Sequence, residues 1–348
     1  MPYTERGDAL AAFSLERMLS NMKDFFVADA AKFDGETITS FFAISSFSVR
    51  EKKGGGGQYL AMVLSDKTGS LDARMWEEFA SAMETCGEGC FVKAQGQISK
   101  YQNRFQITLT RLRLAANSEV DAADFVPATK YDVGEMWAEL RGYVEAFANP
   151  DLKRLVFAFL DDEKIGAEYR EAPAAKMLHH AWLGGLLEHV LCLVRVCRVT
   201  APFYPEVDPD LLVTGAILHD IGKLKELTWG SSFSYSLEGQ LIGHISIAQG
   251  MLREKIGSLT EFPEKLRILV EHMILSHHGK YEFGSPKLPM TPEALLLSTL
   301  DDLEAKMQAM RNEFARDAAA GKSGSEVTEW VRSMERPLLN TKAYLAQE

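Results

Sequence analysis

Apolar and polar positions alternate through much of residues 36–115. The alternating segments are 37–49, 59–64, 71–76, 91–98 and 105–114, and they are rich in β-branched and aromatic residues. This pattern is typical of strands with one buried face. Residues 77–84 have helical spacing instead. Three strands, a short helix and two further strands are the order of an OB-fold, a five-stranded barrel that binds oligonucleotides.

The two loops at one end of this predicted barrel carry cations. The first contains Lys52, Lys53 and four glycines, and the second contains Lys100, Tyr101 and Arg104. Cations attract phosphates, and an exposed aromatic ring stacks on bases. We therefore predict that residues 22–115 form a domain that binds a single strand through these side chains. The alternative is that both loops are solvated hairpin tips or contact another domain or partner.

The apolar spacing changes to a helical period from residue 131 onward. Residues 131–315 are therefore predicted to form an all-α domain, so that the fold is multidomain, a five-stranded OB-fold barrel followed by a helical domain. Residues 116–130 have the composition of a linker. Residues 1–21 are an N-terminal extension without an assigned role, and 316–348 form a polar C-terminal tail that we expect to be helical.

Length and composition narrow the class of protein. The 348 residues exceed what one core usually serves, and 46% hydrophobic with 25% charged residues is typical of a globular protein. The net charge is −11, yet residues 36–115 hold ten Lys or Arg against eight Asp or Glu. No apolar run is long enough for a membrane span, and four cysteines without CxxC spacing exclude a zinc ribbon. We expect a cytoplasmic protein without a membrane partner.

All eight histidines lie in one segment of the chain, and carboxylates accompany them. They are His179, His180, His189, His219, His244, His272, His277 and His278. Histidine is the commonest metal ligand in proteins and a frequent acid–base group. Such crowding predicts a polynuclear metal site and favours a metal-dependent hydrolase.

The spacing indicates how these side chains reach one site. His189 lies within an amphipathic segment, and His219 and Asp220 end an apolar run just before Gly222. Adjacent helical residues point about 100° apart, so both reach one ion only where the helix ends or distorts, which Gly222 permits. With His244, His277, His278 and Asp301, there are enough N and O ligands for two divalent ions of the Mn, Fe, Co, Ni or Zn type.

The order His189, His219-Asp220, Asp301 resembles the signature of the HD-domain metal-dependent phosphohydrolases. His244, His277 and His278 match the subset that binds two metals. The phrases HHAWLGGLLEH (179–189), HDIGKLKEL (219–227), EGQLIGH (238–244) and SHHGKYEFGSP (276–286) are similar to the YhaM-type 3′→5′ exoribonucleases, which also join an OB-fold to an HD domain. The resemblance covers about residues 22–315. The HD-GYP phosphodiesterases are less similar, because Gly279 replaces their Glu.

The resemblance implies a set of ligands for each ion. His189, His219, Asp220 and Asp301 would surround one ion, and Asp220, His244, His277 and His278 the other, with Asp220 bridging and Mn²⁺ as the expected metal. Two ions about 3.5–4 Å apart lower the pKa of water and hold a phosphate in line. Asp220 and Lys223 are the predicted catalytic residues, the lysine as a cation that offsets charge; the alternative for Lys223 is a surface position.

Two further expectations concern the substrate. His179 and His180 are predicted either to contact a substrate phosphate or to cap a helix or orient neighbouring side chains. The function that we predict is a metal-dependent 3′→5′ exonuclease acting on single-stranded RNA, and also on DNA. An HD phosphohydrolase of small nucleotides or cyclic dinucleotides, with the OB domain used for assembly or regulation, remains the alternative. The sequence leaves open whether the protein forms a homo-oligomer. A non-enzymatic scaffold is disfavoured, because the whole ligand set is intact.

Overall fold

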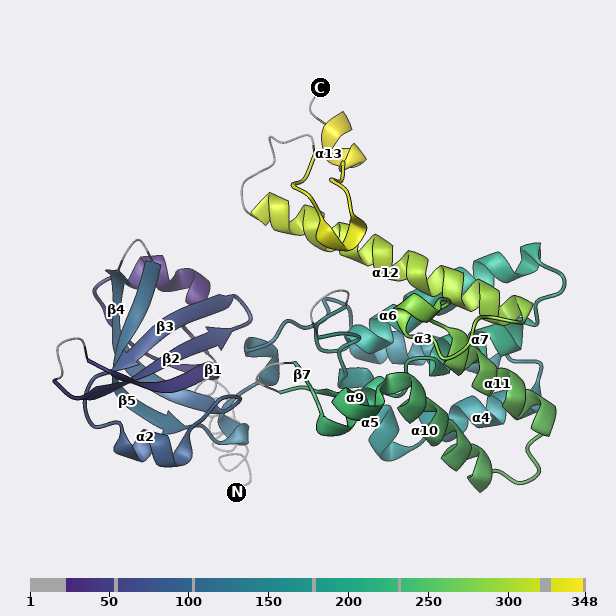
Figure 1. Cartoon of the computed structure of the whole chain (residues 1–348), viewed down its shortest axis with the longest axis horizontal. Helices are drawn as coiled ribbons and strands as arrows, with labels where there is room; N and C mark the ends of the chain where they lie inside the picture. Colours follow the sequence, from purple (N-terminus) through teal and green to yellow (C-terminus); the bar gives the residue numbers. More distant parts are fainter. Residues whose placement is uncertain are drawn as a thin grey trace, which may run out of the picture. The chain divides into compact units, whose positions relative to one another are not determined.

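The structure is a computed structural model that describes residues 23–52, 56–101, 104–176, 180–230, 233–319 and 327–346. The chain forms two compact units (Figure 1). The first ends at Pro127 and takes in Trp229, and the second begins at Ala128. Each unit has its own architecture, and each is described by itself below.

The first unit is a closed five-stranded barrel with the strand order β1-β2-β3-β5-β4. Its strands are β1 (Thr37–Glu51), β2 (Gln58–Asp66), β3 (Gly69–Met75), β4 (Phe91–Tyr101) and β5 (Arg104–Leu114), with α2 (Ala80–Thr85) between β3 and β4. The pairing of β3 with β5 is parallel, and the other pairings are antiparallel. The element order confirms the OB-fold that the alternating pattern predicts.

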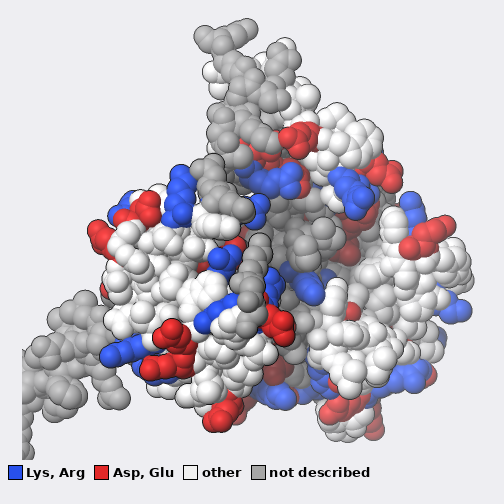
Figure 2. Space-filling model, turned by 60° about the vertical axis from the view of Figure 1, so that its left-hand side comes forward, with Lys and Arg blue, Asp and Glu red and all other residues white. Residues whose placement is uncertain are grey.

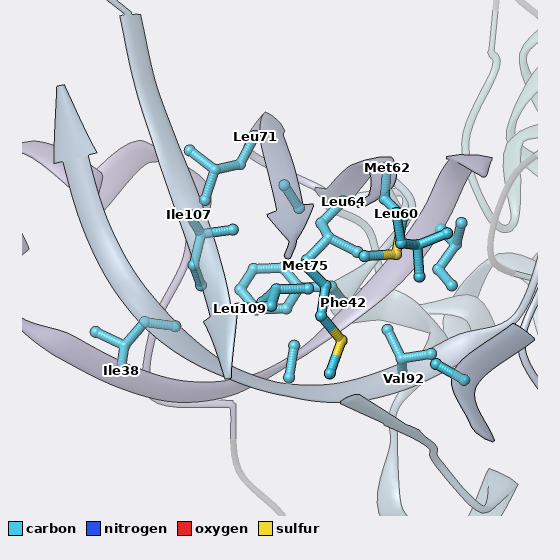
Figure 3. Close-up of a cluster of buried hydrophobic side chains, with 14 of the residues drawn as sticks. Ile38, Phe42, Leu60, Met62, Leu64, Leu71, Met75, Val92, Ile107 and Leu109 are labelled. Carbon is cyan, nitrogen blue, oxygen red and sulfur yellow. The ribbon is translucent and has the colours of Figure 1, made fainter. Parts of the chain in front are cut away.

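Alternate side chains of each strand fill the barrel (Figure 3). On β2, Leu60, Met62 and Leu64 are buried, while the positions between them are only partly buried. Burying a side chain of this size contributes about 1.5–3 kcal/mol to stability. The outward positions of β2 and β3 do not contribute to this core, so that they remain available for contacts outside the barrel.

The predicted linker at residues 116–130 packs partly on the barrel. It contains two short 3₁₀ helices, η2 (Asn117–Glu119) and η3 (Ala122–Asp124). Phe125 follows them, is 4% exposed, and lies 4.6 Å from Phe91 between ring centroids. The apolar side chain at 125 therefore anchors a segment whose overall composition is polar.

The second unit is helical. Its helices are α3 (Val133–Glu145), α4 (Pro150–Leu160), α5 (Glu163–Glu171), α6 (Gly185–Thr200), η4 (Ala201–Phe203), α7 (Pro209–Leu218), α8 (Lys223–Glu226), α9 (Leu237–Ile242), α10 (His244–Ser258), α11 (Glu264–Ser276), η5 (Tyr281–Phe283) and α12 (Pro292–Ala319). The two-residue strands β6 (Leu227–Thr228) and β7 (Ser234–Tyr235) form a hairpin. Helix α12 packs against α6 and α7 (Figure 1), and these three elements bring distant parts of the chain together.

The C-terminal tail differs from the helix that its polarity predicts. Helix α12 continues to Ala319, but Val327 and Leu339 form an isolated β-bridge, and η6 (Arg332–Met334) and α13 (Thr341–Leu345) are short. Pro337 lies inside this segment, and a proline interrupts a helix because it lacks the N–H donor and clashes with the preceding turn. Across the ranges described, no helix combines the length and apolarity needed to cross a membrane.

Candidate metal centre

Helices α6, α7 and α12 bring four of the predicted ligands together. His189 lies on α6 and is fully buried. Helix α7 begins at Pro209 with Asp208 as its N-cap and ends at Leu218, so that His219 and Asp220 follow its last turn, where the sequence predicts a helix end. Asp301 lies on α12. The end of α7 frees His219 and Asp220 from the helical angle that would separate their side chains.

Gly222 has a further role in this arrangement. The helix ends before it, as the spacing predicts, and Gly222 itself has an ordinary helical φ of −65°. A Cβ at Gly222 would lie 2.0 Å from the carbonyl oxygen of His244. The missing side chain therefore allows the turn after Asp220 to approach the first residue of α10 closely, which brings Asp220 near His244.

One group of candidate ligands contains two fully buried histidines and the partly buried Asp301. His189 Nε2 lies 3.2 Å from Asp301 Oδ1 and 3.4 Å from His219 Nε2. His219 Nε2 lies 3.3 Å from Asp220 Oδ2. Ligand atoms of His189, His219 and Asp301 all lie within 4.8 Å of one another, as one divalent ion requires.

A second group lies on the other side of Asp220. Its Oδ1 atom is 3.6 Å from His244 Nε2 and 3.8 Å from His277 Nε2. His244, His277 and His278 also form a cluster with ligand atoms within 4.8 Å of one another. One carboxylate oxygen of Asp220 therefore faces each group, which is the geometry that a bridging ligand needs.

The candidate imidazoles are oriented by bonds at Nδ1. His219, His277 and His278 donate from Nδ1 to the carbonyl oxygens of Ala216, Ile274 and Phe283, at 2.9, 2.8 and 2.7 Å respectively. A proton held on Nδ1 leaves the lone pair of a neutral imidazole on Nε2. The backbone thus prepares these rings to bind a metal through Nε2.

Two buried glutamates orient the remaining rings, those of His189 and His244, through bonds at Nδ1. Neither glutamate was predicted from the sequence. Glu226 accepts from His244 Nδ1 at 3.0 Å, and Glu304 accepts from His189 Nδ1 at 2.7 Å. The only sequence signal for Glu304 is its spacing, because it follows Asp301 by three residues on α12 and so lies on the same face of the helix. Glu226 carries no comparable signal.

The residues fit a bound divalent cation. Asp220 Oδ1, His244 Nε2 and His277 Nε2 are buried and have no hydrogen-bond partner in the described part of the chain. Leaving a buried polar atom unsatisfied costs about 1–3 kcal/mol, so such atoms usually have a partner. A metal ion at this position would be the shared partner of all three atoms, and their N and O chemistry matches first-row transition metals.

The electrostatics of the centre also favour a cation. Burial alone would raise the pKa of Asp220, but Lys223 and His219 hold it well below its usual value, so that the carboxylate stays ionised. Burial lowers the pKa of His189, but Asp301 and Glu304 raise it to about 10. Burial also lowers the pKa of His277, which keeps this ring neutral and able to bind a metal.

The structure gives the predicted catalytic and phosphate-contacting residues different surroundings. Lys223 Nζ lies 2.6 Å from Asp220 Oδ2, so this lysine neutralises the candidate bridging carboxylate directly.

His180 is 1% exposed, and its Nε2 lies 2.9 Å from Glu304 Oε1. A side chain so deeply buried does not reach a substrate phosphate, and the orienting alternative fits it. His179 lies outside the described residues.

On the barrel, Arg74 of β3 and Trp76, which follows β3, lie beside residues of the two predicted loops. Trp76 stacks on Tyr59 with 4.6 Å between ring centroids, and Lys52 Nζ lies 5.8 Å from the centre of the Trp76 ring. Two positions earlier, the Arg74 guanidinium lies 5.5 Å from the Tyr101 ring. Arg74, Trp76 and Tyr59 were missed in the sequence analysis, although the period-two pattern of β2 and β3 places them on the outward face.

The other predicted loop residues are more loosely constrained. Lys100 Nζ lies 5.6 Å from the Phe105 ring, and Arg104 is exposed where β5 begins. Lys53 lies outside the described residues. Figure 2 shows Lys and Arg side chains interspersed with Asp and Glu across the visible face. Aromatic–cation pairs on the barrel are therefore more specific than the overall charge distribution as an indication of ligand binding.

Known families match both units. Residues 186–306 match the HD domain, and residues 47–115 match the OB-fold nucleic acid binding domain. The class of the protein is therefore an HD-domain phosphohydrolase with an N-terminal OB-fold.

Curated relatives define the family further. The "3'-5' exoribonuclease YhaM" of Halalkalibacterium halodurans is 35% identical over 79% of this chain and 85% of its own length. The proteins of the same name from Bacillus subtilis and Listeria monocytogenes are each 36% identical over 79% of this chain and 87% of their own length. The chain belongs to the YhaM family of 3′-5′ exoribonucleases.

Proposed function

We propose that this protein is a metal-dependent exoribonuclease that removes nucleotides from the 3′ end of single-stranded RNA, and also of single-stranded DNA. One observation carries the proposal: buried, unpartnered ligand atoms of Asp220, His244 and His277 face one another in the helical unit. The names of the relatives support the substrate and the polarity of the reaction.

The donor set supports two divalent ions, with Mn²⁺ as the expected metal. One ion would be held by His189, His219, Asp220 and Asp301, and the other by Asp220, His244, His277 and His278. Bound divalent ions supply Lewis-acid chemistry, because they lower the pKa of water and offset negative charge on a phosphate.

The protein's own residues prepare this chemistry. Lys223 keeps Asp220 ionised, and the backbone and glutamate bonds at Nδ1 keep Nε2 of each ring directed at the centre. A lysine so close to the centre also supplies positive charge where the phosphate gains negative charge during hydrolysis.

The barrel is proposed to hold the strand upstream of the cleaved end. Base stacking on Trp76 and Tyr59 is tolerant of sequence, because every base has an aromatic face. Lys52 and Arg104 add attraction for phosphates. Together these contacts suit an enzyme that shortens strands of different sequence.

The test is to incubate Mn-loaded protein with a 5′-end-labelled single-stranded RNA and resolve the products by length over time. A ladder that shortens from the 3′ end is the expected result, and the Asp220→Ala variant should leave the RNA intact. The proposal is wrong if the RNA stays intact while the same protein releases phosphate from nucleotides or cleaves a cyclic dinucleotide. Retained turnover in Asp220→Ala would exclude the bridging role.

A further inference from the structure

Each group of ligands has members that reach solvent. His189, His219 and His277 are buried, whereas His244, His278 and Asp301 are only partly buried. The rings of His244 and His278 lie side by side, 5.1 Å apart between centroids. The edge formed by these two histidines is therefore open to solvent.

The loop that follows His278 is built against this edge. Its 3₁₀ helix η5 carries Phe283, whose carbonyl oxygen accepts the hydrogen bond from His278 Nδ1. The backbone N–H of Gly284 donates to Tyr281 at 2.9 Å, and Gly284 has a φ of +81° that favours glycine. The Ser285 hydroxyl donates to Lys287 at 2.7 Å. These bonds fix the backbone of the loop next to a metal-ligand candidate.

The same loop presents an aromatic ring to solvent. The side chain of Phe283 is 53% exposed, although its backbone is held by His278. Lys280 Nζ lies 5.2 Å from the centre of the Phe283 ring. Near His244, Ile242 is 54% exposed and lies two residues before this histidine in the chain. An exposed apolar side chain thus lies within five residues of each of these two histidines in the chain.

We propose that the Phe283 ring stacks on the base of the 3′-terminal nucleotide, while Lys280 contacts a phosphate of the same strand. An aromatic ring on a fixed loop offers a stacking surface at a low entropic cost, and a neighbouring cation suits the polyanionic strand. The carbonyl oxygen of Phe283 orients His278 and the ring positions the base, so that one residue aligns the strand with the centre. This inference rests on the proposed exoribonuclease function and identifies its terminal subsite.

Stacking on the Phe283 ring determines which 3′ ends the subsite accepts. A stacking surface accepts any base, so the subsite recognises that a base is present and not which base it is. The base of a paired 3′ end is stacked inside a duplex and is not free to occupy the ring. The subsite thus selects an unpaired terminal nucleotide of any sequence.

The experiment compares two 5′-labelled RNAs that differ only at the 3′ terminus, where one has an ordinary nucleotide and the other an abasic one. Removal of the first nucleotide is measured in single turnovers with Mn-loaded protein. The wild-type protein should remove the ordinary terminus about 5- to 150-fold more efficiently, the ratio that corresponds to a stacking free energy of about 1–3 kcal/mol. Phe283→Ala should lose this preference, and Phe283→Trp should retain it.

Phe203→Ala is the matched control. Phe203 is 78% exposed in the same unit and lies in η4, directly after α6. It follows His189 by fourteen residues, about 20 Å along a helix axis. This variant should keep the wild-type preference. Because the hydrogen bond to His278 uses the backbone of Phe283, thermal unfolding and metal content of Phe283→Ala should match those of the wild type.

The outcomes separate the two proposals. If the wild type and Phe283→Ala show the same preference for the ordinary terminus over the abasic one, the stacking subsite is wrong. The exoribonuclease function is unaffected by that result. An equal rate for ordinary and abasic termini in the wild type also overturns the stacking subsite. If the wild-type protein shortens neither RNA, the exoribonuclease function fails and the subsite fails with it.

Discussion

Glu304 holds two imidazoles with one carboxylate. Oε2 faces His189 at 2.7 Å, and Oε1 faces His180 at 2.9 Å. His180 has a φ of +48°, an uncommon conformation for a residue other than glycine. Burial alone would raise the pKa of Glu304, but the hydrogen bonds with His180 and His189 lower it below its usual value. An ionised Glu304 thus orients His189 and increases its basicity toward a metal.

Glu304→Gln should weaken metal binding, because an amide cannot accept from both histidines with the strength of a carboxylate. We expect the Kd for Mn²⁺ to rise by about 10- to 100-fold, the usual effect of removing such a partner. Isothermal titration calorimetry on metal-free protein measures this. Asp302→Asn, on the same helix but paired with Lys306 at the surface, is the control and should bind as the wild type does. Equal affinities in all three proteins would contradict the orienting role.

The sequence predicts residues of the centre where spacing limits the choices, and misses those that depend on tertiary packing. His189, His219 and Asp220 stand out because histidine is rare elsewhere in the chain and their order is distinctive. Nothing local distinguishes Glu304 from the other glutamates, since its partner His189 lies 115 positions away. The burial of His180 likewise follows from the packing of α6 and α12 and not from its neighbours.

At the scale of elements, the end of strand β3 carries both kinds of proposed nucleic-acid contact. Arg74 lies on β3 and Trp76 follows its last residue, and each lies beside a side chain of one loop. The strand order was predictable because inward positions alternate regularly. The pairing of Trp76 with Tyr59 was not, because it depends on the register of β2 and β3, which the pattern alone leaves undetermined.

Trp76→Ala and Lys52→Ala should weaken RNA binding in two different ways. Loss of the indole should cost about 1–3 kcal/mol of binding free energy without changing the salt dependence. Loss of the lysine should reduce the slope of log K against log salt by about 1. Fluorescence anisotropy over a salt series distinguishes the two effects. Trp330→Ala, with a 68% exposed indole outside the barrel, is the control. An unchanged affinity for Trp76→Ala would exclude the barrel face from binding.

The close approach of the turn after α7 to α10 leads to a stability prediction. Gly222→Ala places a methyl group against the backbone of His244, and such overpacking costs about 1–3 kcal/mol. Gly250→Ala on α10 is the matched control, since no atom lies within 4 Å of its added Cβ and alanine favours helix by about 1 kcal/mol. Urea unfolding of both variants measures the difference. Equal stabilities would show that the turn can move away without cost.

At the scale of the whole molecule, the candidate centre belongs to one unit only. Every predicted ligand lies in the helical unit, and the barrel has its own core. The barrel followed by a helical domain was predictable, because the apolar period changes between 115 and 131. The tail after Ala319 was not, because short polar segments have no periodic pattern from which their structure follows.

Metal removal should therefore affect the two units unequally. A ligand at a hundred times its Kd stabilises the folded state by about 2.7 kcal/mol, and that contribution disappears on chelation. Hydrogen exchange followed by mass spectrometry should show faster exchange in α6, α7 and α12 after chelation, and unchanged exchange in β1–β5. Asp220→Ala should show no response to metal. A uniform response across both units would indicate that they unfold as one.

The position of Glu304 has a consequence for a chain that is still being synthesised. The barrel is complete once β5 has been synthesised, whereas Glu304 is synthesised 115 residues after its partner His189. At ordinary rates of translation, the synthesis of these 115 residues takes about 6 to 23 s. A nascent chain on its ribosome therefore holds a completed strand-binding barrel well before it holds a completed hydrolytic centre. The messenger RNA that encodes the chain is accordingly not exposed to the finished centre until α12 has been made.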